Sequence, residues 1–122
     1  MPWKYSQNLG ILWHNDVVIT NIGYSGHGAG KNNSTMQTIA NVGPIPQGTW
    51  SIGAPHWNPH TKAYTMNLTP APGTNTFGRT LFRIHGDSQN HPGQASDGCI
   101  VLPIVFRQRI WNSGDHELQV IP

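Results

Sequence analysis

Glycine and proline interrupt this chain so often that short elements joined by many turns are expected. Fourteen glycines and ten prolines make up nearly a fifth of the 122 residues. The chain lacks the richness in Glu, Lys and Ala that is typical of helical proteins, so a mainly β fold is predicted. Five tryptophans and 36% hydrophobic residues rule out a disordered chain. A chain of this length is expected to form a single domain, residues 1–122.

The charged residues are too few and too scattered for a nucleic-acid-binding surface. Charged residues make up only 10% of the chain, and the formal net charge is +2. The largest basic cluster is 107–109, which is too small for a nucleic-acid footprint. Seven histidines invite a search for metal ligands, but Pro59 between His56 and His60 disfavours a helical ligand pair.

The N-terminal segment 1–6 has no apolar core and no small-residue cleavage site, so no signal peptide is predicted. No apolar run approaches the roughly 18 residues of a membrane span. We therefore expect a protein that is made in the cytoplasm without a leader of its own.

Turn residues divide the chain into short segments with β-strand character. Strands are predicted at 3–5, 10–13, 17–22, 49–53, 63–68, 80–85 and 117–121. Segment 25–33 and most of 54–80 are predicted to be loops. One short helix is predicted over 104–111, after Pro103 and before Asn112-Ser113-Gly114.

Cys99 is the only cysteine of the chain, and it lies in Ser96-Asp97-Gly98-Cys99-Ile100. It has no intramolecular disulfide partner, so it serves either packing or reactivity. A nucleophilic thiol needs a nearby base, because few thiols ionise at neutral pH. His85, at the end of the strand predicted over 80–85, is the candidate base.

The same strand sets which residues accompany the base. Alternation places Leu81, Arg83 and His85 on one face, and Phe82 and Ile84 on the other. The carbonyl of Gly86 or the carboxylate of Asp87 is expected to fix the tautomer of His85. The amides of Gly98 and Cys99 are expected to form an oxyanion hole.

Other interpretations of these residues remain open at this point. Cys99 followed by apolar residues also fits a buried small hydrophobe, and a strand histidine often serves only as a structural hydrogen-bond donor. A zinc site made by His85, Asp87, Asp97 and Cys99 is a further alternative, because loop residues can converge.

Three motifs, in order, resemble the L,D-transpeptidases of the YkuD type. Ile84-His85-Gly86 followed by Ser96-Asp97-Gly98-Cys99 resembles the single His-Gly…Ser-His-Gly-Cys signature of that family. Tyr24-Ser25-Gly26 resembles its Ser-Thr-Gly segment, and the segment 44–50 resembles its Thr-Pro-Thr-Gly-Thr-Phe turn. The run 78–88 is similar to that of compact leaderless members that bacteria inject into rivals by type VI secretion.

The resemblance implies a fold and an activity. The expected fold is a mainly β, sandwich-like domain with one short helix after the catalytic cysteine. The expected reaction is attack by the cysteine on the L,D bond between diaminopimelate and D-Ala of peptidoglycan tetrapeptide stems. A thioester acyl-enzyme would then give L,D-carboxypeptidase activity, D-amino-acid exchange, or both. The alternative is a non-catalytic cell-wall-binding or phage-associated domain of the same fold.

The resemblance also implies partners and a place of action. Peptidoglycan stem peptides are the expected partner, with a cognate immunity protein as a second one. No cofactor, metal, nucleic acid or membrane span is expected, and the protein is expected to be a monomer. It would act in the periplasm of a target bacterium.

The site residues carried over comprise two groups. The catalytic residues are Cys99, His85 and Gly86, with Gly98 and Cys99 as the oxyanion hole. Substrate contacts are expected from four residues, Ser25, Trp50, Arg83 and Ser96. An ordinary surface ion pair is the alternative for Arg83. Core packing is the alternative for the aromatic residues Trp50, Trp57 and Tyr64.

The sequence departs from the family pattern at two positions next to the thiol. Asp97 stands where the family has histidine, and Val101 stands where Arg or Asn is common. A carboxylate beside a thiolate would raise the pKa of the thiol. We therefore expect the Asp97 side chain to turn away from Cys99 and to brace its loop by hydrogen bonds.

Overall fold

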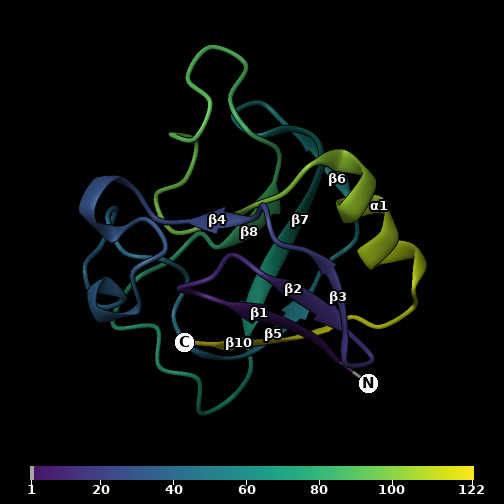
Figure 1. Ribbon diagram of the computed structural model, residues 1–122, viewed down its shortest axis with the longest axis horizontal. Coiled ribbons are helices and arrows are strands. Elements are labelled where there is room, and N and C mark those ends of the chain that lie inside the picture. The colour runs from purple at the N-terminus through teal and green to yellow at the C-terminus, as the bar shows by residue number, and fades with distance from the viewer. Residues whose placement is uncertain (1) are drawn as a thin grey trace.

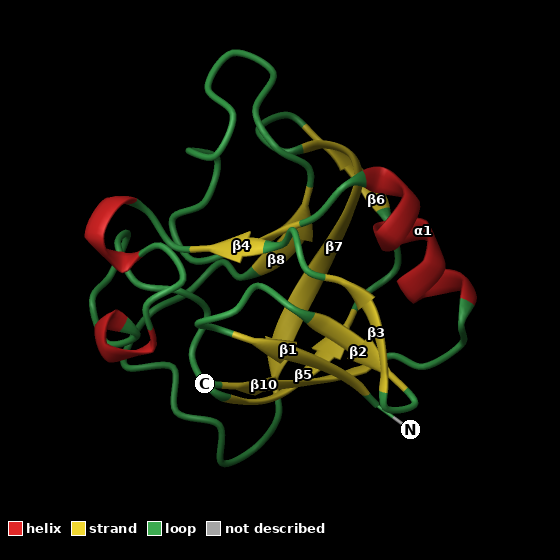
Figure 2. Cartoon of the chain, viewed as in Figure 1, coloured by secondary structure: helices red, strands yellow, loops and turns green. Residues whose placement is uncertain are grey.

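The computed structural model describes residues 2–122, which contain ten strands, one α-helix and two short 3-10 helices (Figures 1 and 2). The strands are β1 (Trp3–Ser6), β2 (Leu12–His14), β3 (Val17–Thr20), β4 (Tyr24–Ser25), β5 (Gly48–Ile52), β6 (His56–Asn58), β7 (Lys62–Pro70), β8 (Arg83–His85), β9 (Ile100–Val101) and β10 (Glu117–Ile121). The helices are η1 (Gly28–Gly30), η2 (Ser34–Met36) and α1 (Ile104–Asn112).

The strands form one sheet in the order β3-β2-β1-β10-β5-β7-β8-β9-β4, and β6 pairs with β7 outside this path. The nine-residue β7 connects the two halves of the sheet, because it pairs with β5 through its end and with β8 through Met66 and Asn67. Most neighbours are antiparallel, but β1–β10 and β8–β9 are parallel. The mainly β architecture with one helix after Cys99 is therefore confirmed.

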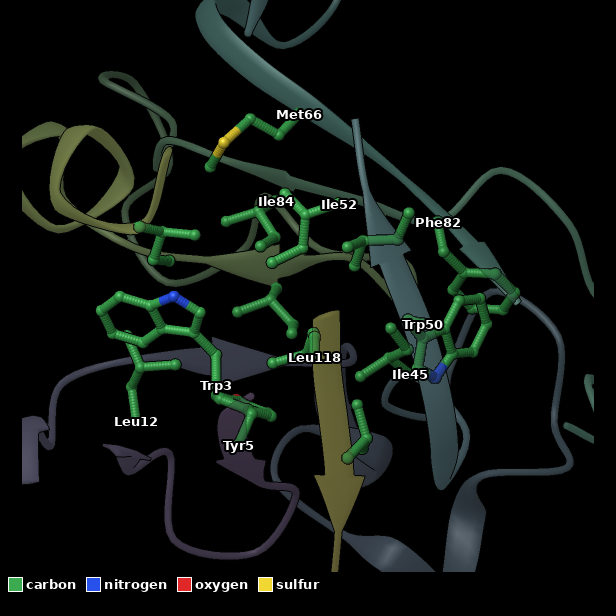
Figure 3. Close-up of a cluster of buried hydrophobic side chains, with 14 of the residues drawn as sticks. Trp3, Tyr5, Leu12, Ile45, Trp50, Ile52, Met66, Phe82, Ile84 and Leu118 are labelled. Atoms are coloured by element: carbon green, nitrogen blue, oxygen red, sulfur yellow. The ribbon is translucent and has the colours of Figure 1, made fainter. Parts of the chain in front are cut away.

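The hydrophobic core lies between the two halves of the sheet. Figure 3 shows Trp3 of β1 and Leu118 of β10 in one cluster with Ile52 of β5 and Ile84 of β8. The helix α1 adds Ile110, which has no exposed surface. Side chains alternate between the two faces of a strand, and in β10 the buried ones are Leu118 and Val120. One face of β10 therefore packs against the core. No helix among residues 2–122 is long and apolar enough to cross a membrane.

Several predicted elements have different bounds in the structure. The helix and the last strand match their predictions closely, whereas the strand predicted over 80–85 is limited to Arg83–His85. Leu81 has a positive φ of 65° and is 72% exposed, so it does not continue the alternation. Segment 25–33 was predicted to be loop, but it begins in β4 and contains η1. The loop predicted over much of 54–80 is shorter, because β6 and a longer β7 form a hairpin there.

Trp50 is a core residue, so its predicted contact with substrate is wrong. It has no exposed surface, and its indole Nε1 donates to the carbonyl of Pro46 at 3.1 Å. Its ring packs edge-on against Phe82, with 4.9 Å between centroids. Tyr64 packs against the same core, whereas Trp57 is 65% exposed. Core packing, the alternative for Trp50 and Tyr64, is what the structure shows.

Replacing Trp50 by Phe is expected to lower stability. The variant loses the indole hydrogen bond and leaves a gap beside Phe82, which together cost about 1–3 kcal/mol of unfolding free energy. The matched control is Trp57→Phe, whose exposed ring predicts a change within about 0.5 kcal/mol. Urea unfolding measures both. Equal stabilities of the two variants would contradict the core assignment of Trp50.

Candidate active site

The parallel pairing of β8 with β9 brings the two candidate catalytic residues together. Ile84 pairs with Ile100, and His85 pairs with Val101. Cys99 immediately precedes β9, so it lies level with the residue before Ile84, which is Arg83. Side chains alternate along a strand, and the two isoleucines are 1% exposed. Arg83, His85 and Cys99 therefore share the face opposite to the core.

This face is hollowed into a cleft of about 500 Å³, which we call the thiol cleft. It is lined by Cys99, Gly98 and His85, by the segment 78–83, and by Ala40, Asn41, His60, Thr61, Ala95 and Asp97. A second cleft of about 710 Å³ is lined by the loop 85–91, by Arg107 and by the same His60 and Thr61. His85 therefore lines both clefts.

His85 is held as a neutral imidazole. It is 3% exposed, and its Nδ1 lies 2.7 Å from the carbonyl oxygen of Gly86. A carbonyl only accepts, so Nδ1 carries the proton and Nε2 is left free to accept one. Burial lowers the pKa of His85, the Gly86 carbonyl raises it, and the charges of Arg107 and Arg83 lower it further. The predicted tautomer-setting role of Gly86 is what this geometry supplies.

Cys99 is a half-buried free thiol. Its Sγ lies 3.5 Å from the carbonyl of Leu81. Burial raises the pKa of this thiol, the Arg83 amide and guanidinium lower it, and the charge of Asp97 raises it, with a net upward result. The resting site therefore holds a protonated thiol and a neutral imidazole, so a proton must move before the sulfur can attack.

Ser96 is the centre of the loop that carries Cys99, and its predicted contact with substrate is wrong. It has no exposed surface. Its Oγ donates to the carbonyl of Cys99 at 2.6 Å and accepts from the amides of Gly26 at 2.9 Å and Gly98 at 3.1 Å. One hydroxyl thus fixes three backbone groups around the nucleophile.

The same hydrogen bond changes the expected oxyanion hole. The Gly98 amide is already engaged by Ser96, so it is not a free donor as predicted. The Cys99 amide remains the candidate donor.

Ser25 also supports the loop from inside and is not the predicted substrate contact. It has no exposed surface, and its Oγ donates to the carbonyl of Gly98 at 3.2 Å and accepts from the Ile45 amide at 2.9 Å.

Arg83, in contrast, is partly exposed and lines the thiol cleft. Its Nε donates to the side-chain oxygen of Asn67 at 3.3 Å. Of the four predicted substrate contacts, only Arg83 reaches a cleft.

Asp97 braces the loop with its backbone. Its side chain is exposed, and its carbonyl accepts from Arg79 at 3.3 Å. The predicted bracing therefore comes from the main chain, whereas the carboxylate acts on Cys99 only through its charge.

Asp87 holds the 87–95 loop instead of the His85 ring. It accepts from the hydroxyl of Tyr24 at 2.5 Å and from the amides of Ser88 at 2.8 Å and Gly93 at 3.0 Å. These bonds and the charge of Lys31 lower the pKa of Asp87. No local sequence pattern indicates the pairing of Asp87 with Tyr24, because the two residues are far apart along the chain.

Two buried arginines next to the site were not predicted. Arg79 donates to backbone carbonyls near Gly98, and Arg107 donates to the carbonyls of Leu102, Ala63 and Tyr64. The one available signal was the position of Arg79 inside the run 78–88. Within residues 2–122, no three His, Cys, Asp or Glu side chains are placed to hold a metal ion, so the zinc hypothesis gains no support.

Comparison with known proteins supports the fold described above. The structure is similar to the crystal structure of an L,D-transpeptidase (Yku) from Stackebrandtia nassauensis, with a TM-score of 0.57 and 15% sequence identity. The match covers 99% of this chain and 55% of the other protein, so the chain spans about half of that protein's length. A search among curated proteins gives no match. The family model of the Tlde1 domain matches residues 19–119, and the chain therefore belongs to the Tlde1 domain family of L,D-transpeptidase-like type VI effector domains.

Proposed function

We propose that this domain is a cysteine enzyme that cleaves the L,D bond between diaminopimelate and D-Ala in peptidoglycan tetrapeptide stems. The observation that carries the proposal is the shared thiol cleft of Cys99 and His85, with Nε2 of His85 left as the proton acceptor. The family and the fold support a peptidoglycan-modifying protein of the L,D-transpeptidase type.

The reaction proceeds in two steps. His85 Nε2 takes the thiol proton, and the sulfur of Cys99 adds to the carbonyl carbon of diaminopimelate. The C–N bond then breaks, and D-Ala leaves with the proton that His85 returns to its nitrogen. This gives a thioester on Cys99 and free D-Ala.

Capture of the thioester decides the product. Water releases a tripeptide stem and restores the thiol, whereas the amine of another D-amino acid gives an exchanged tetrapeptide. Both nucleophiles can lose their proton to His85, and the second cleft beside this residue offers them room. The Cys99 amide stabilises the oxyanion of each tetrahedral intermediate, a contribution worth about 3 kcal/mol for one donor.

Arg83 binds a carboxylate of the substrate. It is partly exposed within the thiol cleft, on the same face as His85 and Cys99. A guanidinium is suited to a carboxylate because it donates two parallel hydrogen bonds. The stem carries carboxylates on its terminal D-Ala and on the diaminopimelate side chain.

The family supports a proposal for the biological setting. We propose that residues 1–122 form one catalytic domain, which acts as a monomer in the periplasm of a target bacterium after delivery by type VI secretion, with a cognate immunity protein in the producer. Loss of tetrapeptide stems would deprive the target of donors for L,D crosslinks.

Removing either reactive group is expected to abolish turnover. Purified disaccharide tetrapeptide is incubated with each protein, and released alanine and tripeptide are measured by mass spectrometry. Cys99→Ala loses all measurable release, because no other thiol exists in the chain. His85→Gln loses roughly 10²–10⁴-fold in rate, as expected for a general base.

The control is His27→Gln, because His27 is exposed and lies outside the lining of both clefts. Unchanged alanine release by folded Cys99→Ala would contradict the cysteine mechanism. Absence of any release or exchange by the wild type would favour the non-catalytic alternative, and release of glycan fragments would indicate another class of enzyme.

The pH dependence is expected to extend to the acid side. Neutral His85 is the reactive form, and its pKa lies below the ordinary value of about 6.5. The rate constant kcat/KM should therefore stay level from pH 8 down to about pH 6.5 and fall only at lower pH. At alkaline pH kcat/KM should fall because the thiol proton, which His85 passes to the leaving D-Ala, is lost to solvent. This fall should begin above the ordinary thiol pKa of about 8.5, because burial raises the pKa of Cys99. An acid limb with its midpoint above pH 7 would contradict a neutral resting imidazole.

A further inference from the structure

Arg79 is a buried cation at the back of the thiol cleft. It is 7% exposed, although arginine is rarely buried without a partner. Its Nη1 donates to the carbonyls of Gln37 at 2.6 Å and Pro44 at 2.7 Å. Its Nη2 donates to the carbonyls of Gly43 at 2.9 Å and Asp97 at 3.3 Å. One guanidinium thus joins the 37–44 segment to the loop that carries the nucleophile.

The charge of Arg79 is not neutralised by an acid. Within residues 2–122, all four of its hydrogen-bond acceptors are backbone carbonyls, and no carboxylate forms an ion pair with it. Its guanidinium lies 5.2 Å from the ring centre of Phe82. Burial lowers the pKa of Arg79, and interaction with Cys99 raises it. Because the guanidinium is buried, water screens its charge only weakly, and this charge acts on Cys99.

The backbone before the thiol is shaped around this guanidinium. Gly98 has a φ of 139°, a conformation that side chains disfavour, and a Cβ built on it would lie 2.4 Å from Nη2 of Arg79. The glycine is needed because the guanidinium occupies the space where a side chain would be. Arg79 and the residue next to Cys99 are therefore in direct contact.

We propose that Arg79 is a positioning residue for the nucleophile: it clamps the loop of Gly98 and Cys99 against the 37–44 segment and fixes a positive charge behind the thiol. This inference rests on the proposed function for its catalytic meaning, but the clamp and the charge are properties of the resting protein. The charge favours the thiolate and the oxyanion that follows it, both of which are negative.

Other groups face the same thiol and must be separated from Arg79. Arg83 on β8 also favours the thiolate, and Asp97 on the nucleophile's own loop disfavours it. His85 on β8 and His60 on the β6–β7 turn line the same cleft. Arg83 lowers the pKa of Cys99 more than Arg79 does, but it is more exposed, so added salt screens the charge of Arg83 more than that of Arg79.

The test measures the rate of alkylation of Cys99 by iodoacetamide between pH 6 and 11. The single cysteine makes the reaction specific, and no peptidoglycan is needed. Arg79→Gln should move the midpoint of the pH profile upward by about one unit, because a nearby cation is lost. Arg79→Lys keeps the charge and should move the midpoint by less than about half of that. The control is Arg109→Gln on the exposed face of α1, which should leave the midpoint unchanged.

Amide hydrogen exchange measures the clamp. Lysine lacks the planar fork that reaches four carbonyls, so exchange in the segment 96–99 should become roughly tenfold faster in both Arg79 variants. An unmoved midpoint in folded Arg79→Gln, or unchanged exchange in both variants, overturns the proposal. If Arg79→Gln does not fold, Arg79→Lys decides the question alone. Faster amide exchange in the segment 96–99, with a nearly unchanged midpoint of the alkylation profile, supports the proposal. Unchanged amide exchange overturns it.

The inference and the proposed function fail separately. If the wild type releases no alanine from tetrapeptide, the proposed function fails, while the alkylation and exchange results still decide the role of Arg79.

Discussion

The parallel pairing of β8 and β9 is the constraint on which the site depends. Strand β9 has only two residues, and β8 has three. Because side chains alternate along a strand, a slip of one residue would turn Cys99 from the cleft into the core. So short a pair does not fix its own register. The register is held from both sides, by β7 next to β8 and by β4 next to β9, and the Ser96 hydroxyl fixes the turn that precedes β9.

Among residues 2–122, the two buried arginines at the site donate to backbone carbonyls and form no ion pair with a carboxylate. Arg107 lies next to Gly86, which follows His85, as Arg79 lies next to Gly98, which precedes Cys99. Arg107 also donates to backbone carbonyls, and a Cβ built on Gly86 would lie 2.7 Å from its Nη2. Each reactive residue therefore has a glycine as its neighbour and a guanidinium against that glycine. This arrangement lowers the pKa of His85 and opposes the effect of burial on the thiol pKa. It gives a site that is neutral at rest and prepared for negative charge.

The sequence predicted that His85 and Cys99 act together, and both line the thiol cleft, but it did not predict the residues that support them. His85, Gly86 and Cys99 were recognisable because thiol chemistry needs few residue types in a fixed order, and local patterns placed them on a strand and a loop. Ser25 and Ser96 were recognised as important but assigned to substrate, because a hydroxyl looks the same whether it faces a cleft or a backbone amide. The use of Arg79 depends on the 37–44 segment lying beside Gly98, which is a long-range contact without a local pattern. Leu81 broke the predicted alternation through its positive φ, which residue type alone does not indicate.

The first and last strands in chain order, β1 and β10, are neighbours in the sheet, with Trp3 paired to Leu118. Strand β10 also pairs with β5, so it is the piece that joins β1–β3 to the rest of the sheet. Strand β10 is synthesised after the nine other described strands, and until it emerges the core side chains of β1 and β5 have no strand between them. Folding of this half is therefore governed by contacts of very long sequence separation, which are slow to form. His85 and Cys99 are therefore synthesised before the strand that closes this sheet.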